Sequence, residues 1–400
     1  MDQTRNDGKV VITNSSCTGN DAGLQILLQL FGILDVLRGA DLFFLVALGP
    51  VVNAIARAAN WEWLNSSMWI FHHVEWEGFA PWDIIMPLFM FMSGITIPFA
   101  LEHYRRGEST HREALWRIAR RVVVLWIFGM MCQGNLLALD PDRIYLYTNT
   151  LQAIAVAYAA AAVLYLFTRV RTQIIAAVVL LLGYWAAMEL FSVGGFGLGD
   201  YTPDGNLAEG IDRLVLGRWR DHATVENGVV VWDAGYHYTW ILSSLTFAVT
   251  GISGMLAGHI LKSRWEDSRK LKVLFVAGAA MVAVALVWSI WMPIVKIIWT
   301  SSMALFAAGI SFILMGIAYY LVDCKGYTRQ SEWLKVYGMN SIVAYMLAQI
   351  FNFRGIANSL LYGLEQYMGD WYQVLLTICH VGTIYLILWV MHRKKIYLKA

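Results

Sequence analysis

The chain has 400 residues, of which 58% are hydrophobic and only 14% are charged, and its formal net charge at pH 7 is +2. Soluble domains carry about a quarter charged residues, so this composition excludes an ordinary soluble fold. We expect a lipid bilayer, and no nucleic acid, as a partner of this protein.

Along the chain, apolar residues gather in windows of about 20, which is the length a helix needs to cross a membrane. Residues 1–23 precede them as a polar tail that lacks the apolar core of a secretory signal peptide. Residues 24–33 are apolar but too short to span, and we expect an interfacial or re-entrant lead into the first helix. The windows predict an all-α polytopic membrane protein with about ten transmembrane helices in one bundle, over residues 37–56, 82–101, 122–139, 149–168, 174–193, 240–261, 273–291, 298–321, 338–353 and 372–391.

Lysine and arginine are distributed unevenly among the loops between these windows. If residues 1–23 lie inside, then the second, fourth, sixth and eighth loops and the C-terminal tail are also inside, and they hold most of the basic residues. Basic loops favour the cytoplasmic side of a membrane. The pattern therefore predicts cytoplasmic N- and C-termini, a transmembrane domain over residues 24–392 and a basic cytoplasmic tail over residues 393–400.

The longest segment on the predicted outer side covers residues 194–239, and it exceeds ordinary connection lengths. Long loops are often functional, so one interpretation is a lid over an outward-facing pocket. The other is a solvated periplasmic loop with a short amphipathic helix. The sequence leaves both open.

Opposite charges lie three residues apart at the inner boundary of the first window, at Asp35 and Arg38. On a helix, this spacing allows a local ion pair. A guanidinium at that boundary also suits the phosphate oxygens of a ligand that enters from the cytoplasm.

A denser group of ionisable residues lies at the outer entrance of the second window, in the segment FHHVEWEGFAPWDIIMPLFMFMSG (residues 71–94). Ionisable groups beside a membrane span usually face a pocket or a water-filled path. A histidine next to a carboxylate also provides a general base near neutral pH. The alternatives are an interfacial belt of aromatic and histidine side chains and a metal site, although adjacent histidines rarely converge on one ion. The candidates are His72, His73, Glu75, Glu77 and Asp83.

Three further polar side chains lie close to predicted spans. Lys296 lies between two windows and is either a ligand contact or a side chain that extends to the membrane surface. Asn340 and Ser341 follow a glycine at the start of the ninth window, where they either bind a ligand or join helices. The four cysteines, at positions 17, 132, 324 and 379, show neither metal-ligand nor disulfide spacing, and we expect no metal.

Taken in order, six segments resemble the transmembrane acyltransferase family of heparan-α-glucosaminide N-acetyltransferase and its bacterial relatives. The resemblance covers most of residues 33–391 and is fairly specific, because all six occur in the same order. The segments are LDVLRG (34–39), HVEWEGF with WDIIMPLFMFMSG (73–94), LQAIAVAY (151–158), GNLAEGIDRLVLG (205–217), PIVKIIWTSS (293–302) and YGMNSI (337–342).

The resemblance implies transfer of an acetyl group from cytosolic acetyl-CoA to the amine of a glucosamine on the opposite side of the membrane. The family's essential histidine matches His73, which would remove the amine proton or briefly carry the acetyl group. Asp83 is expected to orient His73 or the sugar. Contacts with the sugar or the thioester are expected from Asn340, Ser341, Gln152, Glu75 and Asp35.

Cationic side chains are expected to bind the phosphates of acetyl-CoA, and we predict Arg38, Arg120, Arg121, Lys335 and Lys296 for this role. The resemblance places the protein in a bacterial inner membrane, with an amino sugar as its substrate. Aromatic helix faces make a homodimer plausible. Two other functions stay open on the sequence: an amino-sugar transporter with the same polar lining, and an O-acetyltransferase that modifies an envelope polysaccharide.

Overall fold

The computed structural model describes residues 32–327 and 331–398. The predicted tail over residues 1–23 and most of the predicted lead over 24–33 lie outside the described residues. The described part is mainly helical, and its strands form only two short antiparallel hairpins, so the all-α prediction is confirmed.

Eight helices in the described part are long and apolar enough to cross a membrane, which confirms a polytopic membrane protein. The first, Gly32–Ala59, contains a π-helical stretch, η1 (Phe43–Leu48), before α2 (Gly49–Ala59). The second, Pro81–Ala100, joins η3 (Pro81–Ile84), α4 (Ile85–Ile95) and α5 (Ile97–Ala100). The others are α8 (Thr150–Phe167), α9 (Val170–Leu190), α11 (Ser244–Lys262), α12 (Asp267–Trp288), α13 (Ser301–Tyr319) with η7 (Tyr320–Cys324), and α18 (Trp371–Arg393).

Two of the ten predicted spans differ from the prediction. The window over residues 122–139 falls on α7 (His111–Cys132), whose first half is rich in arginine, so only its second half is apolar. The window over 338–353 is broken at Asn340 between α14 (Glu332–Met339) and α15 (Ser341–Ile350), and α15 has only 10 residues. The predicted windows rest on hydrophobicity averaged along the chain, which does not detect a local cluster of charges or a break in a helix.

Side-chain caps define where several of these helices begin. Thr110 accepts the backbone N–H of Glu113 at the start of α7, and Thr300 accepts that of Met303 at the start of α13. Such caps satisfy backbone donors that have no partner within the helix.

Helices α4 and α11 form the centre of the bundle, while α12 is largely exposed on the outside. Gly251, Gly254 and Gly258 of α11 face the backbone of α4 or α8 so closely that a side chain at these positions would collide with carbonyl groups. Small residues at this spacing let membrane helices approach each other closely. The bundle is therefore tight at its centre, beside the cavity described below.

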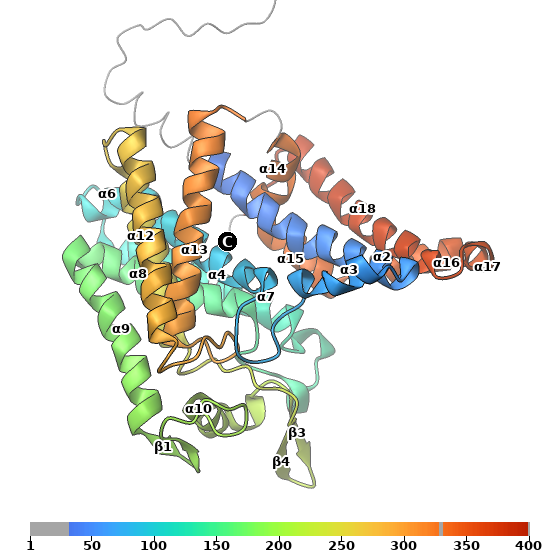
Figure 1. The fold of residues 1–400 in the computed structure, drawn as a ribbon, viewed down its shortest axis with the longest axis horizontal. Helices are drawn as coiled ribbons and strands as arrows, with labels where there is room; N and C mark the ends of the chain where they lie inside the picture. Colours follow the sequence, from blue (N-terminus) through green and yellow to red (C-terminus); the bar gives the residue numbers. More distant parts are fainter. Residues whose placement is uncertain (1–31, 328–330, 399–400) are drawn as a thin grey trace, which may run out of the picture.

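The segment over residues 194–239 is structured and gathers at one end of the molecule, at the bottom of Figure 1. It contains a buried amphipathic helix, α10, and most of two hairpins, so it is more than a solvated loop. The solvated-loop interpretation included a short amphipathic helix, and α10 is such a helix. The elements here are α10 (Leu207–Leu216), β1 (Ser192–Val193), β2 (Phe196–Gly197), β3 (Ala223–Glu226) and β4 (Val229–Trp232).

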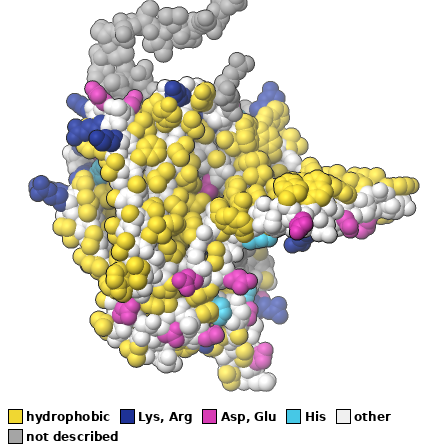
Figure 2. Space-filling model, viewed as in Figure 1, with side chains coloured by type: hydrophobic (Ala, Val, Ile, Leu, Met, Phe, Trp, Pro, Cys, Tyr) yellow, Lys and Arg dark blue, Asp and Glu magenta, His cyan; other side chains and the backbone are white. Residues whose placement is uncertain are grey.

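Shorter helices complete the fold, and two of them, α16 (Phe353–Leu361) and α17 (Glu365–Met368), project beside the end of α2 at the right of Figure 1. Two more are α3 (Glu62–Ser66) and α6 (Glu102–Arg105). Figure 2 shows a broad hydrophobic surface over the long helices, with Lys and Arg gathered at its upper left and most Asp, Glu and His below it. This is the surface expected of a protein whose middle faces lipid.

Candidate active site

A cavity of about 790 Å³ runs through the bundle beside the second span. Its lining includes Trp82, Ile85, Phe89, Ser93, Thr96 and Ala100, which are three or four residues apart and therefore share one face of the helical segment Pro81–Ala100. From Trp82 to Ala100 this face is about 27 Å long, at 1.5 Å per residue. The cavity therefore extends nearly across the predicted membrane region.

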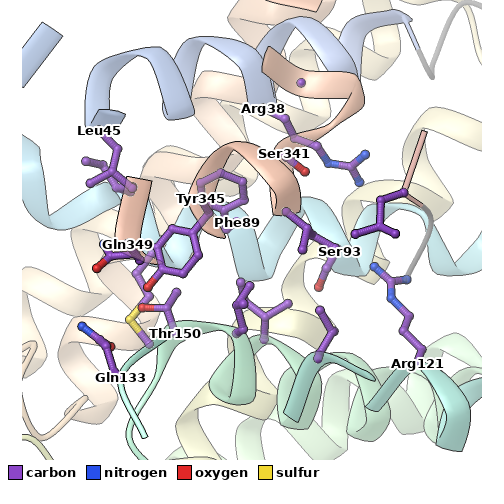
Figure 3. A pocket seen from close by; sticks show the side chains of 18 of the residues that line it. Arg38, Leu45, Phe89, Ser93, Arg121, Gln133, Thr150, Ser341, Tyr345 and Gln349 are labelled. Atoms are coloured by element: carbon purple, nitrogen blue, oxygen red, sulfur yellow. The ribbon is translucent and has the colours of Figure 1, made fainter. Parts of the chain in front are cut away.

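Three arginines line the end of the cavity near Ala100: Arg38, Arg117 and Arg121. Figure 3 shows Arg38 and Arg121 directed from different helices toward the same space. Arg38 also lies 3.8 Å from Asp35, so the predicted local ion pair is present at the rim of the cavity. Arg117 was not among the predicted contacts, although its position one turn before Arg121 on α7 could have indicated it.

Arg121 has no countercharge in the part of the chain that the structure describes. Its guanidinium lies 4.1 Å from the ring centre of Tyr158, and its Nε is buried without a hydrogen-bond partner. A buried cationic donor without a partner is unfavourable unless a ligand satisfies it. This end of the cavity is suited to an anion.

The middle of the cavity is mostly apolar. Met86, Phe89, Leu125, Leu151 and Ile154 line it. A few polar groups interrupt this lining, and Figure 3 shows Gln133, Thr150, Tyr345 and Gln349 on one side. A long, flexible ligand arm with occasional amide groups fits such a lining.

At the other end lie His73 and Lys296, with Asp83 directly behind them. His73 Nδ1 is 2.6 Å from Asp83 Oδ1, and Lys296 Nζ is 3.2 Å from the same oxygen and 2.9 Å from Nδ1. The other carboxylate oxygen, Oδ2, accepts the backbone N–H of Ala80 at 2.9 Å. Asp83 is thus fixed on all sides and orients the imidazole.

Lys296 reaches this group on a loop between α12 and α13. The N–H of Gly78 donates to the carbonyl of Ile294 at 2.8 Å, and the Thr300 hydroxyl holds the backbone N–H of Val295 at 3.1 Å. The sequence interpretation placed Lys296 among the cations for acetyl-CoA phosphates. In the structure, Lys296 lies at the end of the cavity away from the arginines and is paired with Asp83.

The short distance from His73 to a carboxylate indicates that Nδ1 carries the ring proton and donates it to Asp83. Nε2 then keeps its lone pair; 45% of the His73 side chain is exposed, and the residue lines the cavity. Burial lowers the pKa of His73 and Lys296 lowers it further, against the hydrogen bond to Asp83, which raises it. The net pKa is below the ordinary value, so His73 is neutral near pH 7.

An aromatic wall, defined as Tyr236, Tyr238 and Trp240, lines the cavity at the His73 end. The ring centres are 5.6 Å apart from Tyr236 to Tyr238 and 6.3 Å apart from Tyr238 to Trp240. Burial raises the pKa of Tyr238 to about 12, and the charge of nearby Asp83 raises it as well, so this hydroxyl stays protonated. This wall was not predicted from the sequence, although the alternating aromatic residues of YHYTW (residues 236–240) were a signal for it.

Buried carboxylates hold the aromatic wall in place. Asp212 of α10 accepts the backbone N–H groups of Trp240 and Ile241 at 2.8 and 2.9 Å. Asp221 accepts the indole N–H of Trp240 at 3.0 Å and the hydroxyl of Tyr236. The segment 194–239 therefore contributes to one wall of the cavity.

Several predicted ligand contacts have other partners. Gln152 is buried and caps α8, accepting the backbone N–H groups of Thr148 and Asn149 at 2.8 and 3.0 Å and donating to Leu146. Asn340 pairs with the backbone of residues 396 and 398. Neither residue lines the cavity, because both side-chain amides form hydrogen bonds with backbone groups at helix or chain ends.

The remaining predicted residues divide between the cavity and the surface. Asp35 and Ser341 line the cavity. Lys335 forms an ion pair with Glu332 at 2.7 Å, while Arg120 and Glu75 are exposed and are not part of the lining.

The positions of His72 and His73 do not favour the alternative of a metal site. His72 Nε2 is 2.9 Å from the Asn53 amide oxygen, whereas His73 faces Asp83. Within residues 32–327 and 331–398, no group of three or more His, Cys, Asp or Glu side chains could hold a metal ion. The cysteines at positions 132, 324 and 379 are free thiols.

The fold and this cavity define a polytopic α-helical membrane protein with a His–Asp–Lys group at one end of an internal cavity and arginines at the other. No family model matches the chain. Over 328 residues it is 25% identical to human heparan-alpha-glucosaminide N-acetyltransferase, covering 71% of this chain and 49% of the human protein. The mouse enzyme of the same name is 24% identical over 323 residues, covering 70% and 49%.

These similarities establish a distant relationship to the heparan-alpha-glucosaminide N-acetyltransferase family. The chain spans about half the length of the curated relatives that it matches.

Proposed function

We propose that this protein is a transmembrane N-acetyltransferase that moves the acetyl group of cytosolic acetyl-CoA to the amine of glucosamine, or of a terminal glucosamine residue, on the periplasmic side of a bacterial inner membrane. The observation that carries the proposal is the single cavity that joins three arginines at one end to His73 at the other. A donor with a charged nucleotide and a long arm requires that separation. The distribution of basic loops supports the orientation, with the arginine end inside.

The two ends of acetyl-CoA fit the two ends of this cavity. The phosphates would bind to Arg38, Arg117 and Arg121. The buried Nε–H of Arg121 has no acceptor in the described part of the protein, and a phosphate oxygen would provide one. The apolar middle, with its few amide and hydroxyl groups, suits the pantetheine arm. The thioester would then lie beside His73.

His73 is the proposed base. As the amine nitrogen of glucosamine attacks the thioester carbonyl, Nε2 takes the amine proton; the new C–N bond replaces the C–S bond, and the CoA sulfur leaves as a thiolate that then takes up the proton. In a second route Nε2 attacks the thioester first, so that a C–N bond to the imidazole replaces the C–S bond and CoA leaves as a thiolate. The amine then takes the acetyl group from the imidazole, and the proton that it loses passes to the thiolate. Both routes need the Nδ1–H tautomer that Asp83 favours.

The aromatic wall is the proposed acceptor site. Tyr236 and Tyr238 line this end of the cavity; Tyr238 lies near Asp83, whereas the Tyr236 hydroxyl donates to Asp221. An amphipathic sugar ring has apolar C–H faces and polar edges, and both match aromatic side chains with hydroxyl groups.

The test is acetyl transfer from radiolabelled acetyl-CoA to glucosamine by the purified full-length protein in detergent. Wild type, His73→Ala and the matched control His72→Ala are compared, since His72 is the adjacent histidine and contacts Asn53 instead of Asp83. We expect labelled N-acetylglucosamine from wild type and His72→Ala, and none from His73→Ala.

Other outcomes would replace the proposal. Transfer that is unchanged in His73→Ala would contradict the mechanism. Acetyl-CoA binding without transfer to glucosamine, but with label in envelope polysaccharide, would identify an O-acetyltransferase. A protein that binds glucosamine but not acetyl-CoA would favour the transporter. Rapid denaturation of wild type at neutral pH, after mixing with labelled acetyl-CoA alone, separates the two routes, because only the second leaves label on the protein.

A further inference from the structure

The buried carboxylate of Asp83 has two side chains that can neutralise its charge. Its side chain is 2% exposed, and both His73 and Lys296 lie within 3.2 Å of Oδ1. A buried carboxylate requires a countercharge, and a protonated imidazole or an ammonium can provide it. If His73 provided it, Nε2 would carry a proton and would not act as a base.

Lys296 is placed to provide this charge instead. Its side chain is 8% exposed, and the nitrogen lies 2.9 and 3.5 Å from the two ring nitrogens of His73. An ammonium at these distances opposes a positive charge on the ring. Burial lowers the pKa of Lys296, whereas Asp83 raises it and thereby favours the ammonium form.

We propose that Lys296 is a positioning residue that neutralises Asp83, so that Asp83 fixes the ring tautomer of His73 without drawing a second proton onto it. This inference rests on the proposed function, in which His73 is the base. It gives Lys296 a role that neither the sequence nor the relatives' names assign.

The charged and titratable groups around His73 come from three segments. Asp83 and His72 come from its own segment, Lys296 comes from the loop before α13, and Tyr238, which lies near Asp83, comes from the aromatic wall. Burial, Lys296 and His72 lower the pKa of His73, while Asp83 raises it. Among these groups, Lys296 is the cation in direct contact with the ring.

Two variants separate charge from shape: Lys296→Gln removes the charge, and Lys296→Arg keeps it. The matched control is Lys262→Gln, which removes a half-buried lysine from another carboxylate pair, with Glu102. The pH dependence of kcat/KM is measured for each protein in detergent. A second measurement, NMR titration of the His73 ring without substrates, uses ¹³C-labelled histidine and His73→Ala for assignment.

We expect Lys296→Gln to move the acid limb of kcat/KM upward by about one pH unit or more, and the His73 titration with it. Activity should largely return above the new limb. Lys296→Arg should restore the wild-type limb, and Lys262→Gln should leave the titration unchanged. A loss of activity that is equal at all pH values, with an unchanged titration, would overturn the inference.

The two proposals fail in different ways. If His73→Ala retains full transfer while Lys296→Gln still shifts the His73 titration, the proposed function is wrong and the electrostatic role of Lys296 holds. If His73→Ala is inactive and Lys296→Gln leaves the titration in place, the function holds and the role of Lys296 is wrong.

Discussion

Replacing Asp83 by asparagine removes the carboxylate and preserves its shape. In the wild type, Oδ2 accepts the N–H of Ala80 at 2.9 Å, while Oδ1 accepts from His73 at 2.6 Å and Lys296 at 3.2 Å. An amide has one acceptor oxygen, and the backbone N–H of Ala80 requires it. The amide nitrogen must then donate to His73 Nδ1, which moves the ring proton to Nε2.

The magnitude follows from the loss of the base and of the countercharge. General base catalysis contributes roughly 10²- to 10⁴-fold, and we expect kcat of Asp83→Asn to fall by that factor. KM should change little, because Asp83 lies behind the lining of the cavity. Lys296 would be left as a buried, unpaired ammonium, which costs about 3–5 kcal/mol of the free energy of unfolding.

Acetyl-transfer kinetics and thermal unfolding of the purified protein measure the two effects separately. The double variant Asp83→Asn with Lys296→Met removes the unpaired ammonium, so its stability should recover while its activity stays low. Wild-type kcat in Asp83→Asn would refute the tautomer argument. A double variant that is as unstable as the single one would refute the countercharge argument.

Three other predictions follow from the cavity and its wall. Arg121→Ala should raise the KM for acetyl-CoA roughly 10- to 100-fold, because charged hydrogen bonds to the phosphates are lost. Replacing the exposed neighbour, Arg120→Ala, should leave that KM unchanged. Equal effects of the two variants in steady-state kinetics would contradict the phosphate site. Tyr238→Ala should raise the KM for glucosamine roughly three- to tenfold and leave that for acetyl-CoA unchanged, and a change in the acetyl-CoA value alone would remove the wall from the acceptor site. Burial raises the pKa of Asp212 to about 7 from its ordinary value of 3.8, so the stability that its protonated form contributes is complete below pH 4 and is lost as the pH rises through 7. Thermal unfolding temperatures should therefore fall over this interval in wild type and fall less in Asp212→Asn, and parallel curves would show that Asp212 does not titrate there.

Much of the fold could be predicted because each membrane helix corresponds to one continuous apolar stretch of the sequence. Eight apolar windows correspond to eight long helices in the described part. The two mismatches, at α7 and at α14–α15, arise where charge or a broken backbone interrupts a window. Hydrophobicity averaged over a window does not detect such local features.

Part of the site could also be predicted, because its first two members are close in sequence. His73 and Asp83 lie only ten residues apart, and the hydrogen bond from the Ala80 N–H helps to fix the carboxylate beside the ring. Their catalytic roles stay predictions. By contrast, the sequence suggested Gln152 and Asn340 as ligand contacts, yet both bind backbone groups that the fold leaves unpaired. Which backbone groups need a partner is known only when the helix ends are known.

By itself, the sequence determined the membrane class, most of the spans and the position of a histidine with a nearby carboxylate, since hydrophobic windows and short separations are local properties. Only the tertiary structure decided that Lys296 joins His73 from 223 residues away, that an aromatic wall faces them, and that Arg38 and Arg121 share one cavity with both. These contacts depend on how helices pack across the bundle. Packing is set by the fit of many side chains at once, and no single segment records it.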